Sequence, residues 1–208
     1  MKKVLTSLLV GFSLLAGSVF AKGPDEVIRD TGDAVLKLLD ENRDLVGTNS
    51  AEILEKVEAI VFKSLDFEKM SILAIGKNWR KATKAQQVAF IEEFRKLMIR
   101  TYSKSLEEYV DVEIKYLPYN PDSNPKKATI STEVIRKVGP KIPVDYRLYQ
   151  NKEGDWKVYD IKIEGISLVT NYRNSFGQQI RDKGMESLLN LLRKQNSEVT
   201  NTETNKAS

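Results

Sequence analysis

The chain has 208 residues, of which 41% are hydrophobic, and carries 33 Lys and Arg against 29 Asp and Glu. This composition supports a folded core, in one domain or two small ones. The sequence contains no Cys and no His, which excludes a disulfide framework, a Ser-His-Asp triad, a thiol nucleophile and the usual zinc ligand sets. Any catalytic site would therefore depend on Asp, Glu, Tyr, Lys or Ser.

Residues 1–21 have the pattern of a secretory signal peptide. A basic start with two lysines is followed by an apolar run at 4–16 and by a small-residue cleavage site that ends at Ala21. A membrane anchor needs a longer apolar stretch than this one. Removal of the segment lowers the formal net charge from +4 to +2 because two lysines are lost. A net charge of +2 gives little support for a nucleic acid partner.

Apolar residues at helical spacing predict three helices before residue 80. The first begins at Pro24, a favourable residue for a first turn, and ends near Gly47. The second begins at Ser50, the expected N-cap. The third is short, is capped by Asp66 and ends at Gly76. Each helix has an apolar face that must be buried.

A fourth and longer helix is predicted from the capping box of Thr83 and Gln86 to about Tyr109. Its apolar residues cover more than one narrow stripe of the helix surface. The helix must therefore be covered on two sides, or must face a cavity as well as a core. These apolar residues include Phe94, Leu97, Met98 and Tyr102.

The pattern changes to strands after residue 110. Apolar and polar residues alternate in four segments, at 112–116, 127–138, 142–148 and 156–163. Short connections favour an antiparallel meander with helices over one face. The large apolar residues expected on the inner face are Val134, Val144, Tyr146, Leu148, Tyr159, Ile161 and Ile163.

The apolar period changes from two to four at Gly165, which gives the backbone freedom to bend. Ser167 is the expected N-cap of a helix whose apolar stripe contains Leu168, Tyr172, Phe176 and Ile180. The helix breaks at Gly184, and a last short helix ends near Lys194. Residues 22–195 are thus predicted to form a single α+β domain, and the polar tail at 196–208 to be disordered.

Two separated motifs resemble a known family. The runs FEKMSILAIGKNWRKAT at 67–83 and DIKIEGISLVTNYRNSF at 160–176 are similar to those of the MlaC or toluene-tolerance family of periplasmic phospholipid-binding proteins. The resemblance covers roughly residues 25–194. It departs from the family pattern at Lys84, where many relatives have Pro, but this residue only starts a helix, so the departure puts little in doubt. It implies an NTF2-like, curved, four-stranded antiparallel sheet wrapped by helices around an apolar pocket, in a periplasmic protein without enzyme activity, cofactor or metal.

The apolar side chains that face the sheet could fill a core or line a pocket, and the sequence alone leaves both open. The resemblance favours a pocket that holds acyl chains. Arg147 and Arg173 are the candidates for contact with the phosphate of a head group, because Arg meets phosphate bidentately; each could instead form a surface ion pair, for example Arg173 with Glu164. The predicted pocket residues are Phe94, Leu97, Met98, Tyr102, Val134, Val144, Tyr146, Leu148, Tyr159, Ile161, Ile163, Leu168, Tyr172 and Phe176.

The resemblance also implies a function and partners. Such a protein shuttles diacyl phospholipids between the outer and inner membranes and so maintains outer-membrane lipid asymmetry. The implied partners are an inner-membrane ABC transporter with a ring of MCE domains and an outer-membrane lipoprotein–porin complex. Two alternatives remain: a periplasmic chaperone or scaffold with a filled core, and an enzyme that uses Asp145 or Asp160 as a base beside a Tyr.

Overall fold

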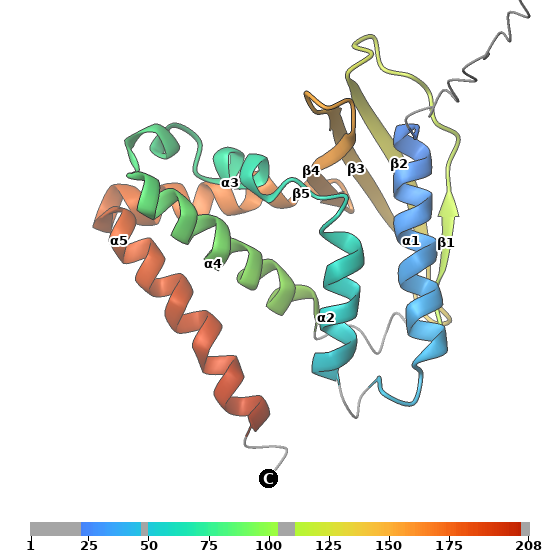
Figure 1. Cartoon of the computed structure of the whole chain (residues 1–208), viewed down its shortest axis with the longest axis horizontal. Helices are drawn as coiled ribbons and strands as arrows, with labels where there is room; N and C mark the ends of the chain where they lie inside the picture. Colours follow the sequence, from blue (N-terminus) through green and yellow to red (C-terminus); the bar gives the residue numbers. More distant parts are fainter. Residues whose placement is uncertain (1–21, 47–49, 104–110, 205–208) are drawn as a thin grey trace, which may run out of the picture.

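The computed structural model describes residues 22–46, 50–103 and 111–204 (Figure 1). The predicted signal peptide at 1–21 lies outside the described residues, as does the predicted extension of the fourth helix to Tyr109. In the described part, helices and a curved antiparallel sheet form an α+β fold. The predicted fold class is confirmed. No helix among the described residues is long and apolar enough to cross a membrane.

Helices α1 and α3 have the expected starts. Helix α1 (Pro24–Glu41) begins after Gly23, whose backbone N–H donates to the Glu26 carboxylate at 2.7 Å. It ends at Glu41, earlier than predicted. Helix α2 (Ser50–Val61) follows. Helix α3 (Phe67–Ile75) is capped by Asp66, whose carboxylate accepts from the Lys69 N–H at 2.8 Å.

A 3₁₀ helix, η1 (Gly76–Lys81), leads to α4 (Lys84–Ser103). The predicted capping box is present: the Thr83 N–H donates to the Gln86 side chain at 3.0 Å, and the Gln86 N–H donates to the Thr83 hydroxyl at 3.2 Å. These two bonds satisfy backbone donors that the first turn of the helix leaves free. The sequence therefore fixes where α4 begins.

The sheet contains five antiparallel strands in sequential order: β1 (Glu113–Tyr116), β2 (Lys127–Ile135), β3 (Ile142–Gln150), β4 (Trp156–Ile163) and β5 (Ile166–Ser167). Four strands were predicted. The additional one, β5, has two residues and returns against the end of β4 through a turn in which Glu164 and Gly165 have φ of 52° and 81°. A strand so short has no measurable period, so the pattern indicated only a bend there.

A β-bulge interrupts the pairing of β3 with β4. Arg147 lies opposite Asp160, but Leu148 lies opposite Val158, so Tyr159 is the extra residue. The bulge exchanges the two faces of the strand at this point: Val158 is buried on the side of Ile161 and Ile163. The prediction that Tyr159 shares their face is wrong, because the strict alternation from which it came does not continue through a bulge.

The segment between α2 and α3 is held to the edge of β4. The Val158 N–H donates to the Ser64 carbonyl at 2.8 Å, and the Asp66 N–H donates to the Val158 carbonyl at 2.9 Å. These bonds fix the end of α2 relative to the sheet. Helices α1 and α2 consequently lie beside each other next to the sheet, while α3, α4 and α5 form a second group (Figure 1).

Helix α5 (Leu168–Thr204) begins as predicted: the Ser167 hydroxyl accepts from the Thr170 N–H at 3.1 Å. The predicted break at Gly184 is a kink, with φ of 82°, that divides the helix into two arms (Figure 1). The second arm continues past Lys194 to Thr204, where a disordered tail was expected. A polar contact with α4 holds the start of this extension, since the Asn196 amide donates to the Glu93 carboxylate at 2.7 Å.

Candidate functional site

An apolar cavity of about 370 Å³ lies between helices α1 and α2 and the inner face of the sheet. The end of α4 and the start of α5 complete its wall. Glu58 is the one charged side chain among the described residues that line it. The lining residues are Ile28, Thr31, Gly32, Val35, Leu39, Leu54, Val57, Glu58, Val61, Phe62, Ser64, Leu65, Phe67, Met98, Ile99, Ile114, Tyr116, Val134, Val144, Tyr146, Val158, Ile161, Ile163 and Leu168.

The sheet provides one wall through its register. Val144 lies opposite Ile163, and Tyr146 lies opposite Ile161, so two cross-strand pairs of β3 and β4 face the cavity together. Half of the predicted pocket residues line this cavity, and they come from α4, the sheet and α5. They are Met98, Val134, Val144, Tyr146, Ile161, Ile163 and Leu168.

Helices α1 and α2 provide the opposite wall, which sequence reasoning missed. Their apolar stripes were visible in the sequence and were assigned only to burial, because a stripe does not reveal what it covers. Gly32 allows a close approach to β1: a Cβ atom there would lie 2.5 Å from the Tyr116 hydroxyl. That hydroxyl donates to the Asp33 carboxylate at 2.8 Å, and burial raises the pKa of Tyr116.

Four predicted pocket residues instead fill the core between α4 and α5. Phe94 and Phe176 are buried with ring centroids 5.7 Å apart, and the Phe94 and Tyr172 rings lie 5.3 Å apart in an edge-to-face contact. Leu97 is buried in the same cluster. These residues belong to a filled core, which the sequence could not distinguish from a pocket, because the same apolar spacing serves both.

Two of the three other predicted pocket residues, Leu148 and Tyr159, do not line the cavity in the structure. Leu148 is fully buried in the core of the sheet. Tyr159 lies on the outer face, where its ring is 6.0 Å from that of Tyr149. Tyr102 is in α4, and its side chain lies outside the described residues.

The head-group candidates Arg147 and Arg173 also lie away from the cavity lining. Arg147 is on the outer face of β3, where its Nη1 is 3.5 Å from the Asp160 carboxylate. The Nε of Arg173 donates to the Leu73 carbonyl at 2.7 Å and so ties α5 to α3. Both contacts stabilise the fold.

The carboxylates of the enzyme hypothesis have structural partners and do not line the cavity. Asp160 is 2% exposed and accepts from the Ser167 hydroxyl at 2.8 Å and from the Val169 N–H at 3.3 Å. It thereby anchors the start of α5 to β4. Asp145 accepts from the Ser131 hydroxyl at 2.7 Å across β2 and β3.

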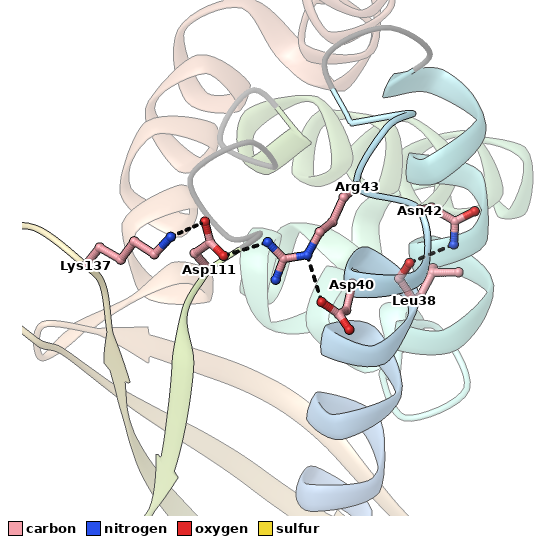
Figure 2. A network of polar contacts seen from close by, with 6 residues as sticks. All are labelled: Leu38, Asp40, Asn42, Arg43, Asp111 and Lys137. Carbon is pink, nitrogen blue, oxygen red and sulfur yellow. Dashed lines mark hydrogen bonds and ion pairs between the residues drawn. The ribbon is translucent and has the colours of Figure 1, made fainter.

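A second cavity, about 640 Å³ in volume and lined by several charged residues, lies between the end of α1 and strands β1 and β2. Figure 2 shows its ion pairs: Arg43 binds both Asp40 at 2.7 Å and Asp111 at 2.8 Å, and Lys137 binds Asp111 at 2.7 Å. The Asn42 amide donates to the Leu38 carbonyl beside them. Hydrogen bonds from Lys137 and Arg43 lower the pKa of Asp111. The charges of this network satisfy one another, which indicates a structural tie.

The Asp111→Asn variant is expected to lose stability in a pH-dependent manner. The carboxylate of Asp111 has a lowered pKa in the folded chain, so its stabilising effect is complete above the ordinary aspartate pKa of about 3.9 and disappears as the pH falls through the lowered value. Urea unfolding at several pH values should show a difference between wild type and variant at neutral pH that vanishes in acid. Asp182→Asn, at an exposed position, is the matched control; a difference that persists in acid would contradict the expectation.

An apolar cavity between a curved sheet and helices, whose described lining holds a single charged group, is typical of a binding protein for an apolar or amphipathic ligand. Comparison with known proteins agrees with this class. The family model described as MlaC protein matches residues 29–194. The chain therefore belongs to the MlaC family, as its two motifs predicted.

Individual relatives span most of the chain. It is 28% identical over 186 residues to the toluene tolerance protein ttg2D of Pseudomonas putida. The aligned region covers 88% of this chain and 84% of that protein. It is 18% identical over 190 residues to the intermembrane phospholipid transport system binding protein MlaC of Haemophilus influenzae, with 89% and 88% covered. The structure matches that of a phospholipid-binding protein from Ralstonia solanacearum in complex with a phospholipid, with a TM-score of 0.79, 27% identity, and coverage of 86% of this chain and 99% of that one.

Proposed function

We propose that the protein is a periplasmic carrier that binds diacyl phospholipids and holds their acyl chains in the apolar cavity between α1, α2 and the sheet. The observation that carries the proposal is this cavity, lined almost entirely by apolar side chains in a member of the MlaC family. The phospholipid bound to the Ralstonia solanacearum protein of similar fold supports it. The carrier has no enzymatic step and needs no cofactor.

The energetics of acyl-chain burial suit a carrier. Each buried methylene is worth about 0.8 kcal/mol, so two acyl chains gain on the order of 20 kcal/mol over water. The same chains gain nearly as much in a bilayer, so transfer between membrane and protein is close to balanced. At about 370 Å³ the cavity is at the lower end of ligand pockets, so we expect α1 and α2 to move outward when two chains are held.

The carrier is proposed to travel between an outer-membrane lipoprotein–porin complex and an inner-membrane ABC transporter with a ring of MCE domains. Family membership and the intermembrane transport system named for the Haemophilus influenzae relative support these partners. Because transfer is nearly balanced, contact with such partners would determine where the lipid is released. Shuttling of this kind would maintain the lipid asymmetry of the outer membrane.

Native mass spectrometry of the mature chain, purified from a bacterial periplasm, tests the binding function. The expected result is a near-stoichiometric adduct with the mass of a diacyl phospholipid, identified after organic extraction. A mass equal to that of the bare polypeptide after gentle purification would contradict the proposal and would favour the scaffold alternative.

A further inference from the structure

Glu58 is the carboxylate in the described wall of the apolar cavity. It is partly buried, and within the described ranges its side chain forms no hydrogen bond or ion pair. Of the other polar side chains of the described wall, Thr31 donates to the Val27 carbonyl, Ser64 to the Val61 carbonyl and Tyr116 to Asp33, and Tyr146 also has an interaction partner. Glu58 is therefore the lining group whose hydrogen-bonding capacity is left for a ligand.

A cation lies on the same side of the cavity. Phe62 follows Glu58 by one helical turn on α2 and also lines the cavity. The guanidinium of Arg95, an exposed residue of α4, lies 4.0 Å from the centre of the Phe62 ring. In the described part of the chain this guanidinium forms no ion pair, so its N–H donors are available. A carboxylate and a guanidinium thus flank one aromatic residue of the wall.

We propose that Glu58 and Arg95 form a head-group subsite that selects phospholipids with a primary ammonium group, such as phosphatidylethanolamine. The Glu58 carboxylate accepts hydrogen bonds from the ammonium, and the Arg95 guanidinium donates to the phosphate. Phe62, beside both residues, covers the start of the acyl chains. This inference rests on the proposed function, since it assigns the specificity of the same cavity.

The selectivity follows from the cost of leaving a partly buried carboxylate unpaired. Burial raises the pKa of Glu58, and the opposing charge of Arg95 offsets only part of that effect; the neighbouring Glu55 raises the pKa further. A lipid ammonium supplies both the missing charge and the missing N–H donors. An anionic head group such as phosphatidylglycerol supplies neither, so it leaves the carboxylate unsatisfied.

Lipid exchange from defined vesicles tests the subsite. The mature chain is incubated with vesicles of equimolar phosphatidylethanolamine and phosphatidylglycerol, reisolated, and its adducts are quantified by native mass spectrometry. Wild type is expected to enrich phosphatidylethanolamine by roughly tenfold, the effect of one charged hydrogen bond. Glu58→Gln should return the ratio to that of the vesicles. Glu55→Gln removes the same charge from an exposed position three residues earlier and should keep the wild-type ratio.

Two further measurements separate the possible failures. Arg95→Gln is expected to lower the loading of both lipids, because both carry the phosphate. Wild type should also prefer phosphatidylethanolamine to phosphatidylcholine, whose quaternary ammonium has no N–H to donate; this comparison needs no variant. An unchanged lipid ratio in Glu58→Gln, or no preference in wild type, would overturn the subsite while leaving the carrier function intact. Absence of any phospholipid uptake by wild type would overturn both.

Discussion

The Ile163→Glu variant is expected to lose its bound phospholipid while it keeps its fold. Ile163 lines the cavity from β4, opposite Val144, so the new carboxylate would enter the space proposed for acyl chains. A carboxylate buried against acyl chains without a partner is strongly unfavourable. The empty cavity can admit water around it instead, and the variant then folds without lipid. Native mass spectrometry should show at least a tenfold loss of the phospholipid adduct, with an unchanged far-UV circular dichroism spectrum.

Ile166→Glu is the matched control for this experiment. Ile166 is paired with Ile163 between β4 and β5, but its side chain is 63% exposed, so the same substitution adds a charge to the surface. We expect Ile166→Glu to retain its lipid. Equal retention by both variants would mean that acyl chains lie elsewhere in the protein, and equal loss would point to disruption of the sheet edge.

Local sequence signals predicted the ends of several helices because each capping side chain forms its hydrogen bonds with residues close to it in the chain. Asp66, Thr83 and Ser167 each cap the helix that follows them, through hydrogen bonds that span three residues. Gly184 interrupts α5 where predicted, since its φ of 82° is outside the helical region. Such features depend on few residues, so they can be predicted without knowledge of the tertiary structure.

Features that depend on distant residues could not be predicted in this way. The bulge at Tyr159 arises from the pairing of β3 with β4, and no residue type in that stretch predicts a bulge. The extension of α5 beyond Lys194 is supported by Asn196, which contacts Glu93 from more than 100 residues away in the chain. Polar composition alone predicted disorder for that segment.

The candidate site was predicted only in part, because some of its walls follow from local sequence patterns and others depend on tertiary packing. Residues on strands β3 and β4 line the cavity because the sheet has one inner face, which alternation indicates. The apolar stripes of the helices are ambiguous: that of α1 lines the cavity, whereas Phe94 and Phe176 fill a core. Only the packing of the helices decides between these outcomes. The family resemblance could not decide it either, because it assigned a pocket to the chain and not to each helix.

The Phe94→Ala variant tests this division between core and cavity. Phe94 is fully buried and its ring contacts those of Phe90, Tyr172 and Phe176. Its truncation removes apolar contacts and leaves a void, which costs about 3–5 kcal/mol in the free energy of unfolding. For a chain of this size that loss lowers the melting temperature by on the order of 10 °C. Thermal unfolding followed by circular dichroism measures it.

Phe62→Ala is the matched comparison, since Phe62 lines the cavity and is only partly buried. It contacts Phe67 edge-to-face at 4.9 Å and the Arg95 guanidinium lies 4.0 Å from its ring centre, but its side chain also borders the apolar cavity. The same truncation there removes fewer contacts and creates no new closed void, so we expect less than half the destabilisation of Phe94→Ala. Lipid retention should rank the two variants in the reverse order: Phe62→Ala should lose more of its bound lipid than Phe94→Ala. If Phe94→Ala instead lost lipid without losing stability, the aromatic cluster between α4 and α5 would be part of the binding cavity, as predicted with the help of the family resemblance.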